Sequence, residues 1–236
     1  MLDISGLQVI YEDNHLIAVN KPVGWLVHGD ATGDTPLSEY VKAYLKIRYK
    51  KPGEVFLGVL HRLDRPVSGV VIFTRTSKAL TRMNKLMQER AIQKTYYAVT
   101  AERPQPINGE LVHYLLKDPQ KNSVKAYAQT GRRTAKAKKA TLQYELAGEM
   151  DGHYLLRVKP LTGRPHQIRV QLSEMGCPIV ADWKYGHRET HPDGGIYLHC
   201  HQMSFVHPVK KEPIAISVDF PAHQYWNWFR GIISSP

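Results

Sequence analysis

The sequence has little cysteine and no long apolar run. Only Cys177 and Cys200 occur among its 236 residues, which excludes a disulfide framework and indicates a reducing compartment. The longest apolar runs, such as LIAV and VVIF, are far too short to span a bilayer. The first residues, MLDISGLQVIYED, carry acids and lack the basic and then apolar pattern of a signal peptide. We therefore expect a cytoplasmic protein that does not contact a membrane.

Several signatures of cofactor and metal enzymes are also missing. There is no glycine-rich loop ending in GK[ST] and no HExxH. HRLD at 61–64 is similar to the kinase catalytic loop, but its spacing differs and no DFG motif accompanies it. Among the 12 histidines, His199 and His201 would share one face of a strand, so a metal site is geometrically possible. The spacing matches no standard zinc pattern, however, and polar histidines that bind no metal are the alternative; we expect no metal and no cofactor.

Acidic residues are scarce relative to basic ones. The 32 Lys and Arg residues against 21 Asp and Glu residues give a formal net charge of +11. A basic domain of this size most often binds a polyanion, either nucleic acid or an anionic membrane, although a soluble protein can simply be basic. Between residues 117 and 139, only Asp118 opposes the basic residues Lys117, Lys121, Lys125, Arg132, Arg133, Lys136, Lys138 and Lys139. This run predicts either a solvated face or a surface that contacts phosphates.

The first half of the chain mixes strand and helix patterns. Residues 15–19, 67–74 and 95–100 are rich in β-branched and aromatic residues, which predicts three strands. Thr35, followed by a proline at the first helical position, is expected to cap a helix, and Ser77 is expected to cap a second helix. Apolar residues recur at helical spacing behind both positions.

The second half is richer in strands. Residues 141–146 and 153–159 alternate apolar and polar side chains, which indicates antiparallel strands with one solvated face. A short helix is predicted over 165–175 and should stop at Gly176. Because strands cluster rather than alternate with helices, we predict an α+β fold with a large mixed, mostly antiparallel sheet flanked by helices and loops. No linker or repeat interrupts the chain, so we expect one catalytic domain over residues 1–236.

The segment HRLDRPVSG, at residues 61–69, carries a carboxylate between two arginines just before a buried strand. Asp64 lies between Arg62 and Arg65, and Gly69 allows another backbone segment to approach closely. Taken alone, the segment is more typical of an ion-paired aspartate in a loop, and a functional carboxylate is the alternative.

Two further segments combine polar and aromatic residues in a way that suggests a site. In QKTYY (93–97), the adjacent residues Tyr96 and Tyr97 must face opposite ways on a strand, so one can join the core while the other faces a cleft. In TGRPHQIR (162–169), arginine, histidine and glutamine gather at a helix start, where anions are favoured. A capped, solvated helix is the alternative for the second segment.

Taken together, these segments resemble the RluA family of pseudouridine synthases. The matching segments, in chain order, are KPVGWLVH (21–28), HRLDRPVSG (61–69), Lys94-Thr95-Tyr96, GRPHQIR (163–169), PIVADWKYG (178–186), Leu198-His199 and Phe205-Val206-His207-Pro208. They keep the order of the family from about residue 9 to about residue 220, which is nearly the whole chain.

The resemblance implies an isomerase that converts a uridine in RNA to pseudouridine and needs no cofactor or metal. By matching position, Asp64 would be the essential carboxylate, which either attacks the anomeric carbon or promotes proton loss from the neighbouring ribose carbon. Tyr96 would pack on the uracil and assist removal of the carbon-5 proton, and Arg169 would ion-pair with Asp64. The substrate-binding residues implied by the same motifs are His61, Arg62, Leu63, Arg65, Lys94, Arg164, His166, Gln167 and Leu198.

Two positions depart from the family pattern. Ala181 stands where the family usually has glycine, and Gln171 replaces the usual histidine. Because the pattern begins near the N-terminus, the resemblance is to single-domain members without a separate N-terminal RNA-binding domain. It implies a tRNA or large-subunit ribosomal RNA (rRNA) substrate, and we expect a monomer.

Elementary chemistry agrees with a single catalytic carboxylate. Glycosidases need two, because an alkoxide leaving group must be protonated, whereas uracil leaves as a delocalised anion. Two other functions stay open: a non-catalytic RNA-binding protein on the same fold, and a nucleoside or glycoside hydrolase. The second would need another carboxylate, a metal site or a mononucleotide pocket, none of which the sequence indicates.

Overall fold

The computed structural model describes residues 2–30 and 32–233. Within these residues, no helix has both the length and the apolar character needed to cross a membrane. The predicted single domain over residues 1–236 includes a few positions, 1, 31 and 234–236, that lie outside the described residues.

The chain forms two compact units. The first contains Met1–Gln93 and Cys200–Val218, and the second contains Lys94–His199 and Asp219–Pro236. The chain therefore leaves the first unit, forms most of the second and then contributes to each once more. That both units act as one catalytic domain stays a prediction.

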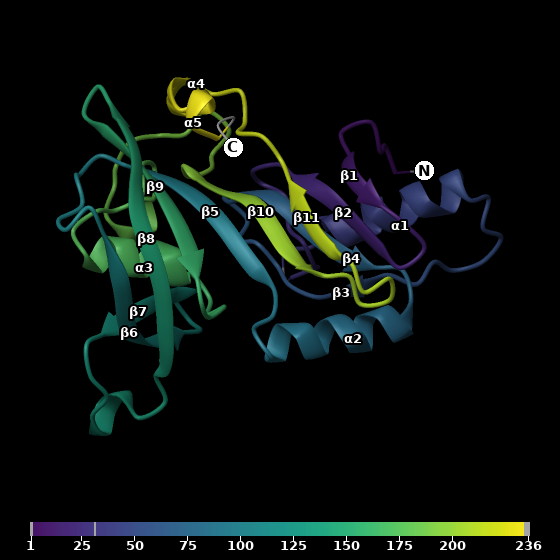
Figure 1. The fold of residues 1–236 in the computed structure, drawn as a ribbon, viewed down its shortest axis with the longest axis horizontal. Helices are drawn as coiled ribbons and strands as arrows, with labels where there is room; N and C mark the ends of the chain where they lie inside the picture. Colours follow the sequence, from purple (N-terminus) through teal and green to yellow (C-terminus); the bar gives the residue numbers. More distant parts are fainter. Residues whose placement is uncertain (1, 31, 234–236) are drawn as a thin grey trace. The chain divides into compact units, whose positions relative to one another are not determined.

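Antiparallel strand pairs build the sheet of the first unit (Figure 1). Its strands are β1 (Gln8–Glu12), β2 (Leu16–Lys21), β3 (Gly58–Val59), β4 (Ser68–Thr74), β10 (Leu198–Val206, in this unit from Cys200 onward) and β11 (Pro213–Ser217). β2 pairs with β1 and β4, β3 pairs with β4, and β11 pairs with β10. Every residue of β4 is buried, as its β-branched run predicts, and each large apolar side chain buried there contributes roughly 1.5–3 kcal/mol.

Two helices of the first unit follow the predicted apolar spacing. α1 (Leu37–Arg48) buries Leu37, Val41 and Leu45 along one face. The residue before it, Pro36, has an extended backbone and is itself the N-cap, so the expectation that Thr35 would cap this helix is wrong.

The second helix, α2 (Ser77–Gln88), has its cap one residue earlier than predicted. Thr76 is extended, and its hydroxyl accepts a hydrogen bond from the amide of Ala79 at 3.1 Å. Ser77 already has helical geometry and cannot take this position, so Thr76 replaces it as the cap.

The second unit contains an antiparallel sheet in the order β5-β9-β8-β6-β7. Its strands are β5 (Gln93–Thr100), β6 (Asn108–Asp118), β7 (Ser123–Tyr127), β8 (Lys138–Met150) and β9 (His153–Pro160). The alternating pattern is confirmed in β8, where Ala140, Leu142 and Tyr144 are buried. In β9 the adjacent residues Leu155 and Leu156 are both fully buried, so the predicted solvated face is interrupted there. β8 is longer than its apolar pattern predicts because it pairs with β6 on one side and β9 on the other.

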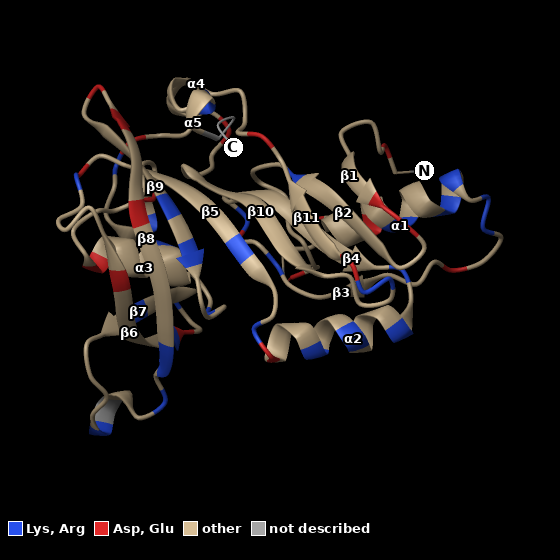
Figure 2. Cartoon of the chain, viewed as in Figure 1, with Lys and Arg blue, Asp and Glu red and all other residues tan. Residues whose placement is uncertain are grey.

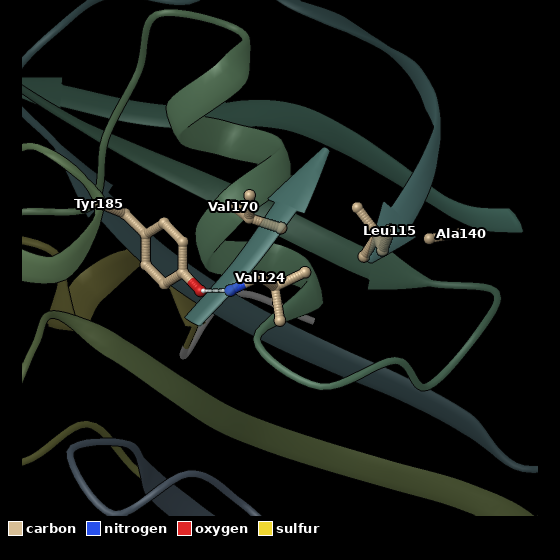
Figure 3. Packing of buried hydrophobic residues seen from close by; sticks show 5 residues of the cluster. All are labelled: Leu115, Val124, Ala140, Val170 and Tyr185. Atoms are coloured by element: carbon tan, nitrogen blue, oxygen red, sulfur yellow. Dashed lines mark hydrogen bonds between the residues drawn. The ribbon is translucent and has the colours of Figure 1, made fainter. Parts of the chain in front are cut away.

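One helix packs on this sheet and encloses a small apolar core. α3 (Gln167–Glu174) contacts β6 and β7, and Figure 3 shows the cluster at that contact. The cluster consists of Leu115, Val124, Ala140, Val170 and Tyr185. The remaining short elements are the 3₁₀ turns η1 (Arg132–Thr134) and η2 (Trp183–Tyr185) and the helices α4 (Gln224–Trp228) and α5 (Arg230–Ile233). Many antiparallel strands with few helices confirm the predicted α+β class.

Candidate active site

Asp64 lies on a loop that leads directly into the buried strand β4. Leu63 and Val67 on either side of it are buried, whereas Asp64 itself is half-buried. The amide of Val67 donates to the Asp64 carbonyl at 3.0 Å, which closes a tight turn over Arg65 and Pro66. The two apolar anchors and this backbone bond fix the main chain that presents the carboxylate.

A buried lysine holds the same loop in place. Lys21, at the end of β2, is 0% exposed, and its ammonium group donates to the carbonyls of Pro22 at 2.9 Å, Trp25 at 2.9 Å and Arg65 at 3.2 Å. The Arg65 carbonyl also accepts from the amide of Gly24 at 2.9 Å. One side chain therefore ties the KPVG turn to the turn that carries the candidate catalytic aspartate.

Burial dominates the ionisation of this lysine. Loss of water around the ammonium group lowers the pKa of Lys21 from 10.5 to about 7, while the negative charge of Asp64 acts in the opposite direction. The unfolded chain therefore holds one more proton than the folded chain between about pH 7 and pH 10. Stability that depends on Lys21 is expected to rise with pH in this window.

The Lys21→Met variant tests this linkage. The difference in the free energy of unfolding between the natural protein and the variant should grow in favour of the natural protein from pH 7 to pH 10. Denaturant unfolding at several pH values measures it, with Lys42→Met, a surface lysine beside Glu39, as the control for removal of one lysine. A difference that stays constant with pH would show that Lys21 keeps its proton throughout.

The other predicted residues of this loop have different surroundings. The ring of His61 accepts a hydrogen bond from the Ile72 amide at 3.1 Å through Nε2, so this histidine helps to hold the loop on β4. Arg62 and Arg65 are exposed, and Arg65 pairs with Asp34 at 2.8 Å. Such an exposed pair contributes less than about 1 kcal/mol, so Arg65 can exchange Asp34 for another anion at little cost.

Gly69 confirms the predicted close backbone approach. Its φ of +119° lies in the region that favours glycine, and a Cβ atom added there would stand 2.3 Å from the carbonyl oxygen of Cys200. Any side chain at this position would push β10 away from the end of the loop.

In the second unit, the GRPHQIR segment is fixed by a buried amide. The side-chain oxygen of Gln167 accepts from the Thr162 hydroxyl at 2.8 Å and the Arg164 amide at 3.0 Å, and its nitrogen donates to the Thr141 carbonyl at 3.0 Å. The structure thus brings Arg164 and Gln167 into contact. These contacts shape the loop before α3; direct substrate binding by Gln167 stays a prediction.

Arg169 forms a buried ion pair that its motif does not predict. Its Nε donates to Asp182 Oδ2 at 2.7 Å and its Nη2 to Asp182 Oδ1 at 2.9 Å. Arg169 is 6% exposed and Asp182 is 1% exposed, so the fork is shielded from water. Two parallel bonds fix the plane of the guanidinium group, which a single contact could not do. The predicted pair between Arg169 and Asp64 stays a prediction.

The remaining predicted residues lie on strands. Both tyrosines of β5 are buried, and Tyr97 packs edge-on against Phe220 with ring centres 5.1 Å apart. Tyr96 pairs with Val158 of β9, and Lys94 two residues earlier is half-buried. Leu198, at the start of β10, is buried.

Three residues with evident roles were missed as site residues: Lys21, Asp182 and Tyr185. The signal was present, because each lies in a segment that matched the family pattern. Asp182 is the only acid in PIVADWKYG, and in the sequence it follows the predicted helix that carries Arg169. The family match and the position in the sequence do not indicate which residues Lys21, Asp182 and Tyr185 contact.

The two departures from the family pattern have different surroundings. Ala181 has a φ of +68°, the region that favours glycine, so the turn keeps a conformation suited to glycine with an alanine in it. Gln171 is fully buried, and its amide nitrogen donates to the carbonyl of Leu111 at 3.1 Å and lies 3.0 Å from Nδ1 of His113. It therefore serves to connect α3 with β6.

The fold defines the class of protein. The structure titled Human RNA Pseudouridylate Synthase Domain Containing 4 matches 94% of this chain and 92% of its own, with a TM-score of 0.75 and 21% sequence identity. The structure of Human RNA Pseudouridylate Synthase Domain Containing 1 matches 100% of this chain and 98% of its own, with a TM-score of 0.71 and 19% sequence identity. The chain thus has the fold of pseudouridylate synthase domains.

Sequence comparison gives the family. The profile of the RNA pseudouridylate synthase family matches residues 15–174, and the chain belongs to this family. It is 31% identical over 220 residues to ribosomal large subunit pseudouridine synthase C of Escherichia coli K12, and 30% identical over 225 residues to the protein of that name from Vibrio cholerae. These matches cover 88% and 91% of this chain but 65% and 66% of those relatives. The resemblance to the RluA family is thereby confirmed.

Proposed function

We propose that the protein converts a uridine in structured RNA to pseudouridine, with Asp64 as the essential carboxylate. The observation that carries the proposal is the family match over residues 15–174. This range includes Asp64, Tyr96 and Arg169, the residues to which the resemblance in sequence assigns the chemistry. The loop around Asp64 supports it, because Leu63, Val67 and Lys21 anchor this loop and a catalytic group must be held in one orientation.

In the proposed reaction, the bond between the ribose anomeric carbon and the base nitrogen breaks and uracil leaves as an anion. Asp64 either adds to the anomeric carbon or removes a proton from the neighbouring ribose carbon. The uracil then rotates and its carbon 5 bonds to the anomeric carbon, as the carboxylate of Asp64 leaves that carbon or returns the proton to the neighbouring ribose carbon. The proton on carbon 5 is lost to solvent with the help of Tyr96, and the base nitrogen that left the ribose takes up a proton. The target base must leave its stack for this, which costs a few kcal/mol.

The proposed substrate is large-subunit rRNA. Support comes from the relatives in Escherichia coli and Vibrio cholerae, whose names refer to the ribosomal large subunit. Transfer RNA is the second candidate substrate, and its support is the resemblance to single-domain family members alone. Because bases in folded RNA are recognised through shape and flipped-out nucleotides, the particular uridine depends on the RNA fold.

The basic run of residues 117–139 is the proposed phosphate-binding surface. It covers the end of β6, β7, the turn with η1 and the start of β8, and in Figure 2 Lys and Arg are visible around η1 and the adjoining end of β8. Its exposed basic residues are Lys117, Lys121, Lys125, Arg132, Lys136, Lys138 and Lys139. Exposed cations on one hairpin of a protein with net charge +11 suit the backbone of RNA.

Salt dependence tests this surface. In a variant with glutamine at Lys121, Lys125 and Lys136, the slope of log affinity against log salt concentration should fall by about 0.7–0.9 for each phosphate that the protein no longer neutralises. Filter binding of an rRNA fragment at salt concentrations from roughly 50 to 200 mM measures this slope. The matched control replaces the exposed residues Lys50, Lys78 and Lys85, so that net charge changes equally. Equal slopes in the two variants would contradict a dedicated surface.

Nucleoside analysis of treated RNA separates the three candidate functions. Conversion of uridine to pseudouridine supports the proposal. Release of free uracil indicates a hydrolase, and bound but unchanged RNA indicates a non-catalytic binding protein.

A further inference from the structure

Tyr185 is a buried tyrosine whose hydroxyl lies between two functional segments. It ends the short turn η2 and is only 9% exposed. Its ring belongs to the cluster with Val124 and Val170 that joins β7 to α3, and Figure 3 shows its hydroxyl aimed at the Val124 amide. Val124 is part of the basic hairpin, whereas α3 carries Arg169.

The hydroxyl makes two hydrogen bonds that constrain each other. It accepts from the Val124 amide at 2.9 Å and lies 2.7 Å from Nδ1 of His166. The amide can only donate, which leaves two arrangements at the second bond: the hydroxyl donates to Nδ1 of His166, or the hydroxyl oxygen accepts from an Nδ1–H. The bond from the Val124 amide favours the first arrangement, because the hydroxyl then accepts one bond and donates one. In that arrangement a neutral His166 carries its own proton on Nε2.

The same tyrosine also contacts α3 at two further points. The Arg169 guanidinium carbon lies 5.1 Å from the centre of the Tyr185 ring, within the range of a cation–π contact. The hydroxyl of Ser173 donates to the Tyr185 carbonyl at 2.6 Å. Ring, hydroxyl and carbonyl thus each bind a different part of α3 or its cap.

His166 needs such support because its backbone is unusual. It is the N-cap of α3 with a φ of +50°, a left-handed conformation that non-glycine residues adopt only rarely, and its side chain makes no capping bond. Conformations of this kind persist where surrounding contacts impose them, and they cluster at functional sites. The Tyr185 hydroxyl is one of those contacts.

We propose that Tyr185 is a positioning residue that holds His166 as the Nε2–H tautomer, so that the imidazole presents a fixed donor to the RNA. The inference rests on the proposed function for the identity of the ligand. The tyrosine acts through His166 and is not itself a catalytic residue. Because its hydroxyl is also bonded to β7, the donor is fixed relative to the hairpin that carries the phosphate-binding lysines.

Nitrogen NMR of the full-length protein without RNA tests the proposal directly. At alkaline pH, His166 of the natural protein should give the ¹⁵N shifts of an Nε2–H imidazole, and Tyr185→Phe should shift it towards a mixture of tautomers. An Nδ1–H ring in the natural protein, or an unchanged tautomer in the variant, would overturn the proposal. The natural-protein spectrum remains decisive if the variant does not fold, and neither spectrum requires turnover.

A double-mutant cycle adds a test in the reaction. Tyr185→Phe should lower kcat/KM on rRNA on the order of tenfold in the natural background but less than about twofold in a His166→Ala background. The control is Tyr144→Phe, which also removes a hydroxyl hydrogen bond, 3.0 Å to the Pro106 carbonyl, and should leave kcat/KM unchanged. Additive losses in the cycle would mean that Tyr185 does not act through His166. Inactivity of the natural protein would instead remove the proposed function and leave the NMR result to stand.

Discussion

Asp64→Asn should abolish turnover while RNA affinity stays the same or rises slightly. Asparagine has nearly the same shape as aspartate but can neither attack the anomeric carbon nor accept a proton, so the rate should fall by at least about 10³-fold. The loop should keep its form, because the bond from the Val67 amide goes to the backbone carbonyl of Asp64 and Lys21 binds other carbonyls. Removal of an anion cannot weaken the attraction for a polyanion.

The matched control for this prediction is Asp34→Asn. It removes the carboxylate that pairs with Arg65 on the same loop, so it reproduces the change in charge without touching the proposed catalytic group. Turnover should stay within a few-fold in this variant, since exposed pairs contribute little. Retained turnover in Asp64→Asn, or equal losses in both variants, would remove Asp64 from the mechanism.

Arg169→Lys should cause the second largest loss of rate although the positive charge is kept. Lysine can make one contact to Asp182 where arginine makes two, at 2.7 and 2.9 Å, and it lacks a plane to lie against Tyr185. Loss of orientation at a catalytic group is expected to cost on the order of 10²-fold in kcat. The free energy of unfolding should fall by about 1–3 kcal/mol, because one buried carboxylate oxygen loses its donor.

Arg157→Lys is the control for the arginine variant. Arg157 pairs with Glu145 at 3.1 Å on the partly exposed surface of β8 and β9. An exposed pair contributes little to the free energy of unfolding, and lysine keeps the charge on which this contribution depends. Single-turnover kinetics and thermal unfolding of both variants should show losses only for Arg169→Lys. If Arg169→Lys kept near-normal turnover, the forked geometry would have no part in catalysis.

The elements that sequence predicted best are those with strong periodic patterns. One is the β-branched run of β4, and the other is the repeat of Leu37, Val41 and Leu45 in α1. Each pattern has one low-energy way to be buried, so the local pattern and the final structure agree. The helix caps were less certain, because Thr76 and Ser77 are both good capping residues and only the backbone geometry decides between them.

The contacts within the site could not be predicted in the same way. A lysine is seldom fully buried, and one of the three carbonyls that bind Lys21 belongs to Arg65, 44 residues along the chain. Asp182 lies 13 residues after Arg169, beyond the reach of helical or strand spacing. Such pairs depend on tertiary folding, so motif matching can indicate that these residues matter without indicating what they contact.

Release of tritium from carbon 5 of uridine reports directly on the proposed isomerisation through Asp64, because that hydrogen is lost when pseudouridine forms. Large-subunit rRNA and bulk tRNA, labelled at that carbon, would be incubated separately with the natural protein and with Asp64→Asn. We expect the natural protein to release tritium from rRNA, close to one tritium for each target uridine, and the variant to release none. Release by both proteins, or by neither from either RNA, would contradict this expectation.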